Sequence, residues 1–415
     1  MATAKATAKL LTYDEALAIV LTRVTPLHPQ SVRLEDATGR VLREDIRTDR
    51  DLPPFDRATM DGFAVHSGKV RPGVQFQITA SLRAGQSPRL PRTDGVMRIA
   101  TGAVIPEGYD AVIPVEQAEI STNKNESVRF CTGRVEPGLN IHRRGADASN
   151  GHIIVPTGVR LRSPQIGLAA SVGCHQLRIS PEPRVTVLST GDELQPLETP
   201  THQLQPHQIR NSNGPMIAAF VRSLAGASPI QLNQDHAPDN PSSTRLAAER
   251  ALSRSDLVLT TGGVGVSAHD LLASTWGQLG LVSVLHGVRI QPGKPLLVCQ
   301  EHGGHVLVLG LPGNPVSALV TAHLFLWPVW RKMLGLNPKL PWRPIRLAGP
   351  AQPCANREVF RAVKLVGPNR DRAAVIPWQG SGDLTHTVTS DGWIRLPQQA
   401  RIIHPDATVP FLPLR

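Results

Sequence analysis

The chain has 415 residues, 40% of them hydrophobic and 19% charged, so it can bury two to four ordinary domain cores and is not disordered overall. Its formal net charge of +11 favours an anionic partner, which could be a phosphate, an oxyanion, a nucleic acid or an acidic protein. The four cysteines form no CxxC pair, which argues against a zinc ribbon or a disulfide framework and favours a reducing cytoplasm.

The chain begins with a predicted amphipathic helix, because Thr12 and Glu15 form a capping box ahead of an apolar stripe. Residues 49–147 read as an inserted β-rich domain, with short strand-like runs at 75–78, 111–114 and 128–131. Ser163 and Pro164 then supply an N-cap and a first-turn proline for a helix that reaches Val172. This helix is expected to pack beside the opening helix in a discontinuous domain of residues 1–48 and 148–178.

Residues 179–336 alternate between strand-like and helical runs, which predicts a doubly wound, mostly parallel α/β sheet. The expected strands are 184–188, 256–260 and 305–309, and the expected helices are 215–224, 243–252, 270–279 and 315–334. Residues 337–415 return to short β-like runs, so the fold class is multidomain α/β and β with a small C-terminal β domain. The apolar run at 315–330 is too short to span a membrane comfortably, and no signal peptide is evident.

Two strand ends in the α/β segment look suited to anions, because such sheets bind ligands beyond the carboxyl ends of their strands. The strand at 256–260 runs into a glycine-rich loop that contains Gly262, Gly263 and Ser267. The strand at 305–309 runs into Gly310–Ser317, where Asn314 is the expected N-cap and Pro315 the first helical residue. A tight turn without a ligand is the alternative for either loop.

Carboxylates recur at turn-like positions: Asp61, Asp147, Glu193, Asp239 and Asp270. A subset of them is a candidate for Mg²⁺, which takes carboxylate oxygens together with substrate phosphates; the alternative is that each caps a turn in solvent. Candidate cations for an anionic substrate are Lys294, Arg289, Arg143, Arg144 and Arg361, each of which could instead be salt-bridged or solvated. The fifteen histidines show no HExxH pattern, so none is assigned to zinc.

A series of longer motifs resembles the MoeA and gephyrin E-domain family, the molybdopterin molybdenumtransferases. Leu52-Pro-Pro-Phe-Asp-Arg-Ala-Thr-Met-Asp-Gly-Phe-Ala-Val65 is similar to the family signature. Further matches follow in family order across nearly the whole chain, at 98–103, 106–112, 140–147, 189–194, 212–213, 262–263, 292–295 and 310–318.

The resemblance implies a split helical domain, an inserted β-rich domain, a molybdopterin-binding α/β domain and a C-terminal β-barrel-like domain. It also implies a homodimer whose cleft lies between the α/β domain of one subunit and the inserted domain of the other. Asp61, Thr101 and Asp147 would then face Glu193, Asp239, Asp270 and Lys294 across the dimer. The chain would be cytoplasmic, bind no nucleic acid or membrane, and contact other proteins of molybdenum cofactor biosynthesis.

The implied activity is insertion of molybdate into adenylylated molybdopterin, with release of AMP and with Mg²⁺ offsetting charge on the pyrophosphate. The implied catalytic residues are Asp61, Thr101, Asp147, Glu193, Asp239, Asp270, Lys294 and Arg361. The residues expected to bind the pterin nucleotide or molybdate are Gly262, Gly263, Ser267, Arg289, Pro312, Gly313, Asn314, Ser317 and Ser381.

Five positions depart from the family pattern: Ala146, Gly265, Ser267, Gly287 and Gln291. Gly287 and Gln291 stand where relatives commonly carry basic residues, which puts molybdate affinity in question. On an extended strand positions 287, 289 and 291 face the same way, so Arg289 is predicted to supply the missing charge.

Three other functions are open to this sequence. A related step, pterin adenylylation, uses the same α/β module, although the inserted domain argues for metal insertion. A catalytically impaired paralogue or a cofactor carrier would keep the fold and lose basic residues, as at Gly287 and Gln291. A nucleic-acid-binding module is disfavoured because only 4% of residues are aromatic and no recognised motif is present.

Overall fold

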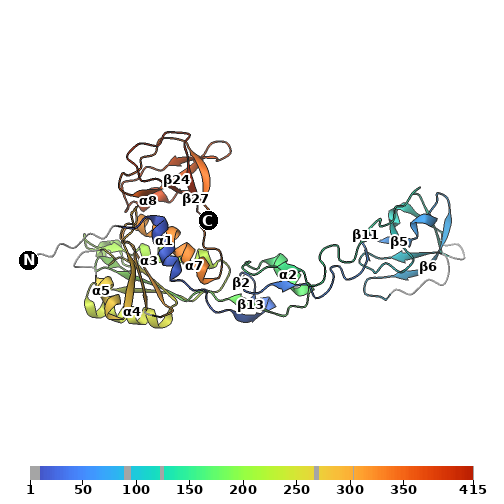
Figure 1. Ribbon diagram of the computed structural model, residues 1–415, viewed down its shortest axis with the longest axis horizontal. Coiled ribbons are helices and arrows are strands. Elements are labelled where there is room, and N and C mark those ends of the chain that lie inside the picture. Colours follow the sequence, from blue (N-terminus) through green and yellow to red (C-terminus); the bar gives the residue numbers. More distant parts are fainter. Residues whose placement is uncertain (1–9, 88–94, 122–125, 266–270, 302, 415) are drawn as a thin grey trace, which may run out of the picture. The chain divides into compact units, whose positions relative to one another are not determined.

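The computed structural model describes residues 10–87, 95–121, 126–265, 271–301 and 303–414. The chain divides into two compact units, drawn with the rest of the chain in Figure 1. Unit 1 comprises Met1–Arg43, Gly158–Leu161 and Arg178–Arg415, and unit 2 comprises Glu44–Thr157 and Arg162–Leu177. Each unit has its own buried apolar clusters and therefore its own core.

A six-stranded sheet forms the centre of unit 1, in the order β17-β14-β18-β22-β21-β19. The first four strands in this order are parallel, whereas β21 and β19 extend one edge in antiparallel fashion. The strands are β14 (Val185–Thr190), β17 (Leu232–Ala237), β18 (Leu257–Thr261), β19 (Leu281–His286), β21 (Leu297–Glu301) and β22 (Leu307–Leu311). The mostly parallel sheet was predicted, but β17, β19 and β21 were not.

Helices cover both faces of this sheet, because alternate strand residues point to opposite sides. Leu257 and Leu259 join the larger core cluster with α3 (Asn213–Ala225), whereas Val258 joins a second cluster. The second cluster contains α4 (Pro241–Arg254) and α5 (Leu271–Gln278). Figure 1 shows α4 and α5 on the face of the sheet opposite α1 (Tyr13–Thr22) and α3.

A closed five-stranded barrel forms the C-terminal part of unit 1. Its strands follow the order β24-β25-β23-β27-β26, and pairing of β26 with β24 closes the ring. The strands are β23 (Arg343–Leu347), β24 (Glu358–Val366), β25 (Arg372–Val375), β26 (Gly392–Leu396) and β27 (Thr408–Pro413), with the short helix α8 (Leu384–Thr387) between β25 and β26. A two-residue strand, β20 (Ile290–Gln291), pairs in parallel with β24 and joins the α/β part to the barrel.

The first helix, α1 (Tyr13–Thr22), has the predicted capping box. The Glu15 backbone N–H donates to Thr12 Oγ1 at 3.3 Å, and the Thr12 N–H donates to Glu15 Oε2 at 2.8 Å. The helix packs against β19 and α7 (Trp327–Met333), with Tyr13 buried and its hydroxyl donating to the Leu324 carbonyl at 3.4 Å. Helix α1 is therefore built into the core of unit 1.

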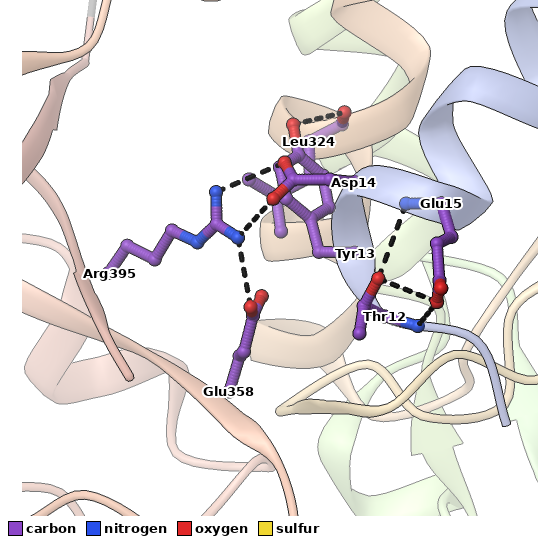
Figure 2. A network of polar contacts seen from close by, with 7 residues as sticks. All are labelled: Thr12, Tyr13, Asp14, Glu15, Leu324, Glu358 and Arg395. Atoms are coloured by element: carbon purple, nitrogen blue, oxygen red, sulfur yellow. Dashed lines mark hydrogen bonds and ion pairs between the residues drawn. The ribbon is translucent and has the colours of Figure 1, made fainter. Parts of the chain in front are cut away.

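Arg395 on β26 ties α1 to the barrel (Figure 2). Its guanidinium donates to Asp14 at 2.6 Å and to Glu358 at 2.9 Å, and it lies 5.0 Å from the centre of the Tyr13 ring. Burial alone would lower the pKa of Arg395, but the hydrogen bonds to Asp14 and Glu358 raise it. The cation therefore stays charged in a half-buried position.

We expect Arg395→Met to destabilise unit 1 by about 3 kcal/mol, because it leaves the Glu358 carboxylate buried without its cation. All six tryptophans lie in unit 1, so denaturation followed by tryptophan fluorescence reports on this unit. Arg33→Met, which removes an exposed ion pair to Glu35, should cost under about 1 kcal/mol. Adding Glu358→Leu to Arg395→Met should recover much of the loss; no recovery would contradict the orphaned-carboxylate explanation.

A long helical stretch follows β22 and lies in the larger core cluster. It comprises α6 (Pro315–Thr321), a π-helical turn (Ala322–Leu326) and α7 (Trp327–Met333). His323, in the π-helical turn, donates from Nδ1 to the Leu319 carbonyl at 2.8 Å and packs between Phe220 and Trp393, at ring distances of 4.5 and 6.0 Å. Burial lowers the pKa of His323 to about 4, so this ring is neutral near pH 7.

The lowered pKa of His323 predicts acid sensitivity. The unfolded chain binds a proton at His323 more readily than the folded chain does. Protonation therefore does not reduce the free energy of unfolding well above pH 6.5, but this free energy falls as the pH is lowered from about 6.5 to about 4. At pH 5 the loss should be about 2 kcal/mol relative to pH 8. In His323→Leu the drop in unfolding free energy between these two pH values should shrink by that amount, whereas in the exposed control His202→Leu it should not. Equal drops in both variants would contradict the assignment.

Unit 2 is β-rich, as predicted for the insertion. Its main sheet has the order β8-β5-β7-β6-β10-β9, with a core that includes Phe63, Ile113 and Phe130. The strands are β5 (Gly62–Val65), β6 (Gln75–Leu82), β7 (Val96–Ile99), β8 (Ala111–Pro114), β9 (Ala118–Ser121) and β10 (Ser127–Phe130). Two small ribbons pair β4 (Arg57–Ala58) with β11 (Ile141–His142) and β3 (Ile46–Arg47) with β12 (Ile153–Val155).

Several local predictions need correction or remain open. The helix α2 (Ser163–Ser171) has Arg162 as its N-cap, so Ser163 is already the first helical residue. It contacts β12 in unit 2, while α1 belongs to unit 1, and the four domain boundaries drawn from the sequence stay a prediction. A three-stranded sheet has the order β1 (Gln30–Arg33), β13 (Gln176–Ser180), β2 (Val41–Leu42). None of the helices in the described ranges is long and apolar enough to cross a bilayer.

Candidate active site

The sheet topology of unit 1 creates a crevice beside the end of β14. Ser189 on β14 is opposite Thr261 on β18, and Thr261 is opposite Leu311 on β22, so these strands end together. The chain runs from β14 through α3 to β17 on one side, and from β17 through α4 to β18 on the other. The strand order therefore reverses between β14 and β18, the place where open α/β sheets bind ligands.

A cavity of about 850 Å³ lies at this edge of the sheet. Its walls include residues that the sequence analysis assigned to substrate: Glu193, Gly262, Gly263, Lys294, Pro312, Gly313, Asn314, Ser317 and Ser381. The volume suits a nucleotide-sized ligand. The walls also include Thr190, whose hydroxyl is buried without a hydrogen-bond partner among the described residues, so a polar atom is available to a ligand.

The first glycine loop requires its glycines. Gly262 and Gly263 have φ angles of 92° and 61°, which favour glycine. A Cβ on Gly262 would lie 2.9 Å from the Thr190 carbonyl oxygen, and one on Gly263 would lie 3.0 Å from a methyl of Leu272. The loop can therefore turn close to the end of β14. Ser267 and Asp270, predicted further along it, lie outside the described residues.

The second loop packs against the first. A Cβ on Gly313 would lie 3.6 Å from the Gly262 Cα, and the Asn213 side chain donates to the Gly313 carbonyl at 2.6 Å. Asn314 is the N-cap of α6 and Pro315 is its first residue, as predicted. The Asn314 side chain does not cap the helix but donates to Ser381 Oγ at 2.8 Å. The loop is thus held by the barrel as well as by α3.

Lys294 brings a positive charge to the cavity wall. Its carbonyl accepts from the Val288 N–H at 2.9 Å, which fixes the backbone. The neighbouring Gly293 has a φ of 105°, and a Cβ there would lie 2.6 Å from a methyl of Thr321, so the turn needs glycine. The Lys294 side chain is exposed and makes no ion pair within the described residues. Its ammonium is therefore available to an anion.

The barrel supplies a wall of the cavity that sequence reasoning largely missed. Ser381 was predicted, and its carbonyl accepts from the Val316 N–H at 3.0 Å. Arg357 and Trp378 also line the cavity, as do the polar residues Asn211 and Ser212 of the α/β part. Arg357 and Trp378 follow no local motif and reach the cavity through the pairing of β24 with β20, so no periodic signal would have found them.

Arg361 does not line the cavity. Its guanidinium lies 4.7 Å from the centre of the Trp378 ring, and its Nη2 donates to the Ile376 carbonyl at 3.1 Å. Burial lowers the pKa of Arg361 from its usual value. Arg361, which was predicted to act on the substrate, therefore contacts Trp378 on the cavity wall and does not line the cavity itself.

The segment from Gly287 to Gln291 is not a regular extended strand. Gly287 has a φ of 89°, and a Cβ there would lie 2.8 Å from the Leu10 side chain. The Ile290 N–H donates to the Val288 carbonyl at 2.9 Å, which turns the backbone at Arg289. Gln291 lines the cavity and Arg289 does not, so the premise that residues 287, 289 and 291 share one face is wrong. That Arg289 supplies the positive charge missing at Gly287 and Gln291 stays a prediction. It is tested by measuring the turnover of Arg289→Ala across molybdate concentrations.

The carboxylates predicted for magnesium are dispersed. Glu193 lines the cavity, whereas Asp239 is exposed elsewhere, its N–H donating to Asp192 Oδ1 at 2.9 Å. No group of three potential metal ligands occurs within the described ranges. Mg²⁺ is commonly bound by one or two carboxylates together with waters and substrate phosphates. Glu193 fits that mode, and a cage made by protein alone is not present in the described part.

Asp61 and Thr101, both predicted, meet in unit 2. The Asp61 carboxylate accepts from the Thr101 N–H at 2.6 Å and from its hydroxyl at 2.8 Å. These hydrogen bonds hold the pKa of Asp61 below its usual value, so the exposed carboxylate stays ionised. The Ala58 N–H donates to the Ala103 carbonyl at 3.0 Å, which joins the two loops.

Asp147 is exposed in the same unit and lies 2.9 Å from His142 Nε2. The two neighbouring arginines are not free: Arg143 pairs with Asp56 at 2.6 Å and Arg144 with Asp51 at 2.8 Å. Hydrogen bonds from the Arg144 backbone and the Arg143 side chain keep the pKa of Asp56 low. Arg143 and Arg144 would therefore have to give up these ion pairs in order to bind substrate as predicted.

Comparison with known protein families gives two matches that together cover most of the chain. Residues 11–173 match the family described as MoeA N-terminal region (domain I and II). Residues 186–332 match a probable molybdopterin binding domain. The second match contains β18, β22 and all but the first residue of β14, and the ends of these strands border the cavity.

Relatives with known names cover nearly the full length. The molybdopterin molybdenumtransferase of Synechocystis sp. is 30% identical over 91% of this chain and 93% of its own length. That of Synechococcus elongatus is 33% identical over 94% of this chain and 96% of its own. A crystal structure of the molybdopterin biosynthesis MoeA protein from Pyrococcus horikoshii aligns with a TM-score of 0.81 and 30% identity, covering 98% of this chain and 99% of that one.

Proposed function

The chain belongs to the MoeA family of molybdopterin molybdenumtransferases, and from this premise we propose that it inserts molybdate into adenylylated molybdopterin with release of AMP. It is accordingly a transferase of molybdenum cofactor biosynthesis. The observation that carries the proposal is the cavity at the strand-order reversal, where two glycine loops and Lys294 converge.

The cavity residues lower the cost of bringing two anions together. Molybdate and the pyrophosphate of the adenylylated pterin repel each other, and this repulsion grows when water is excluded. Lys294 and Arg357 place positive charge on the cavity wall, and the backbone of the two glycine loops can approach a phosphate closely. Their contribution is placement and electrostatic stabilisation, not covalent chemistry.

The reaction joins two changes. The two dithiolene thiols bind the molybdenum of molybdate, and their protons leave with one molybdate oxide as water. One water cleaves the phosphoric anhydride, so that AMP leaves and the terminal phosphate stays on the pterin. The buried Thr190 hydroxyl and the Asn213 amide oxygen, which lack partners among the described residues, are available to orient the substrate at the end of β14. Ser317 and Ser381 add hydroxyls on the side of α6.

Glu193 is the proposed carboxylate ligand of Mg²⁺ in the cavity. When bound there, Mg²⁺ would offset negative charge on the pyrophosphate. Asp239 and Asp270 remain candidate second ligands in unit 1, as do Asp61 and Asp147 in unit 2. Ser267 and Arg289 likewise remain candidates for substrate binding, and Arg361 for catalysis.

A homodimer is also part of the proposal, and it rests on the family resemblance. In such a dimer Asp61, Thr101 and Asp147 of one subunit would serve the cavity of the other. Asp61 is suited to this role because its carboxylate is exposed, ionised and oriented by Thr101. We also propose a cytoplasmic location and contacts with other proteins of cofactor biosynthesis.

The alternative function, an impaired paralogue or a carrier of cofactor, is not favoured. The relatives that match over nearly the whole chain are named as transferases, and Lys294 is retained on the cavity wall. Gly287 alone is not evidence of a lost function, because its φ angle of 89° favours glycine at this position.

An assay with purified full-length protein tests the proposed function. The protein is given adenylylated molybdopterin, Mg²⁺ and low molybdate, and both AMP and active cofactor are measured. We expect AMP and cofactor to appear in equal amounts and to depend on molybdate. AMP without cofactor would favour an impaired paralogue, and the absence of both would favour a carrier.

A further inference from the structure

Trp378 is the one aromatic side chain among the described residues that line the cavity. It follows β25 in the barrel and lies between Ile376, which receives a hydrogen bond from Arg361, and Ser381, which is bonded to α6 and to Asn314. The segment that carries Trp378 is therefore fixed on both sides, and the indole is held at the wall without support from a ligand.

Arg361 covers one face of this indole. Its carbon Cζ lies 4.7 Å from the ring centre, a distance at which a guanidinium is attracted to an aromatic face. Its Nη2 is directed to the Ile376 carbonyl, 3.1 Å away, so the guanidinium plane is anchored by the backbone of the same segment. The arrangement restricts rotation of the indole, which packs partly against the main core cluster and also lines the cavity.

The other described walls offer chemistry for anions and polar groups. They are formed by glycines, prolines, polar side chains, the carboxylate Glu193 and the cations Lys294 and Arg357, with Leu194, Ile209, Val264 and Ile290 as aliphatic members. A ligand that carries both phosphate and a flat heteroaromatic ring would find partners for its phosphate at many points. A π surface for its ring is offered by Trp378.

We propose that Trp378 stacks on a heteroaromatic ring of the nucleotide-pterin substrate, and that Arg361 is a positioning residue that holds the indole for this contact. The inference rests on the proposed function, since it is that function which brings a ring into the cavity. Adenine and pterin are both flat bicyclic heteroaromatic rings, and Trp378 provides the same chemistry for either. This contact gives Arg361 a role in substrate binding although Arg361 does not line the cavity.

The test uses full-length protein and two separate probes, AMP for the adenine ring and 6-carboxypterin for the pterin ring. Calorimetric Kd values are measured for both, together with KM and kcat for adenylylated molybdopterin. Trp378→Leu should raise the Kd for one probe about tenfold and raise KM by a similar factor, whereas Trp378→Phe should keep most of the affinity. The probe that responds identifies the ring.

A matched control is available in the same unit. Trp327 carries Arg331 over its ring at 4.8 Å but does not line the cavity. Trp327→Leu should therefore leave both Kd values and KM within about twofold. If wild-type protein turns over and Trp378→Leu leaves KM and both Kd values unchanged, stacking is rejected while the proposed function stands. If the wild-type protein neither releases AMP nor forms cofactor, the proposed function fails and the stacking role fails with it.

Arg361 is tested through its coupling to Trp378. Arg361→Gln should raise KM several-fold in the wild-type background and have little further effect in Trp378→Leu, since it acts through the indole. Arg361→Lys keeps the charge but not the planar group, and it should not restore KM fully. An equal effect of Arg361→Gln in both backgrounds would mean that Arg361 contacts substrate directly, and would overturn the positioning role.

Discussion

Replacement of Lys294 by glutamine is expected to lower molybdenum transfer about a hundredfold, with little change in folding. The ammonium is exposed on the cavity wall and has no described ion-pair partner, so its removal leaves no buried charge unpaired. Loss of one preorganised donor to a developing charge typically costs a factor of about 100 to 1,000 in turnover. The measurement is AMP release and cofactor formation at saturating and at low molybdate.

The control for this variant is Lys339→Gln, which removes an exposed lysine that does not line the cavity. Its turnover should match wild type, which separates the local effect of Lys294 from the effect of net charge on substrate attraction. Equal activity of Lys294→Gln and Lys339→Gln would remove Lys294 from the site. A loss that high molybdate reverses would assign the ammonium to molybdate binding, whereas a loss at all concentrations would assign it to the transfer step.

Replacement of Asp61 by asparagine is the second change with a large expected effect, a loss of about thirtyfold to a hundredfold in turnover. Asparagine keeps the shape of the side chain and can still accept one hydrogen bond from Thr101, so the loop should stay folded. What disappears is a carboxylate that is ionised because the Thr101 hydrogen bonds lower its pKa. The same assay measures the loss.

Glu107→Gln is the matched control for Asp61→Asn, because Glu107 is an exposed carboxylate elsewhere in unit 2. It should retain wild-type turnover. Thr101→Val should reproduce part of the Asp61→Asn loss, since it removes the hydroxyl donor but keeps the backbone N–H bond. If Asp61→Asn is as active as Glu107→Gln, the exposed carboxylate has a structural role alone.

The glycine loops could be predicted from sequence because their constraints are local. Gly262, Gly263 and the Asn314-Pro315 pair lie next to the strands that they follow, and the structure places all of them on the cavity. The assignment of Asp61 and Thr101 to one site came from a family resemblance, but their hydrogen bonds, across 40 residues of sequence, were not predicted. Local physics alone does not reveal such a contact.

The parts that escaped prediction depend on long-range packing. Trp378 and Arg357 reach the cavity because the barrel strand β24 pairs with β20, and neither residue has a periodic pattern that signals this. Arg289 does not share a face with Gly287 and Gln291, because Gly287 has a positive φ and the backbone turns before β20. Strand β17 was missed because its sequence, Leu-Asn-Gln-Asp-His-Ala, is mostly polar and only partly buried at the sheet edge.

Coexpression of Lys294→Gln and Asp61→Asn chains in one cell tests most directly whether a cavity in unit 1 is completed by unit 2 of another subunit. Random pairing would make about half of the dimers mixed, each with one site that carries both native residues. We therefore expect the coexpressed protein to recover about a quarter of wild-type turnover, while each variant alone stays near its own low value. A coexpressed mixture no more active than the two variants measured separately would contradict the shared site.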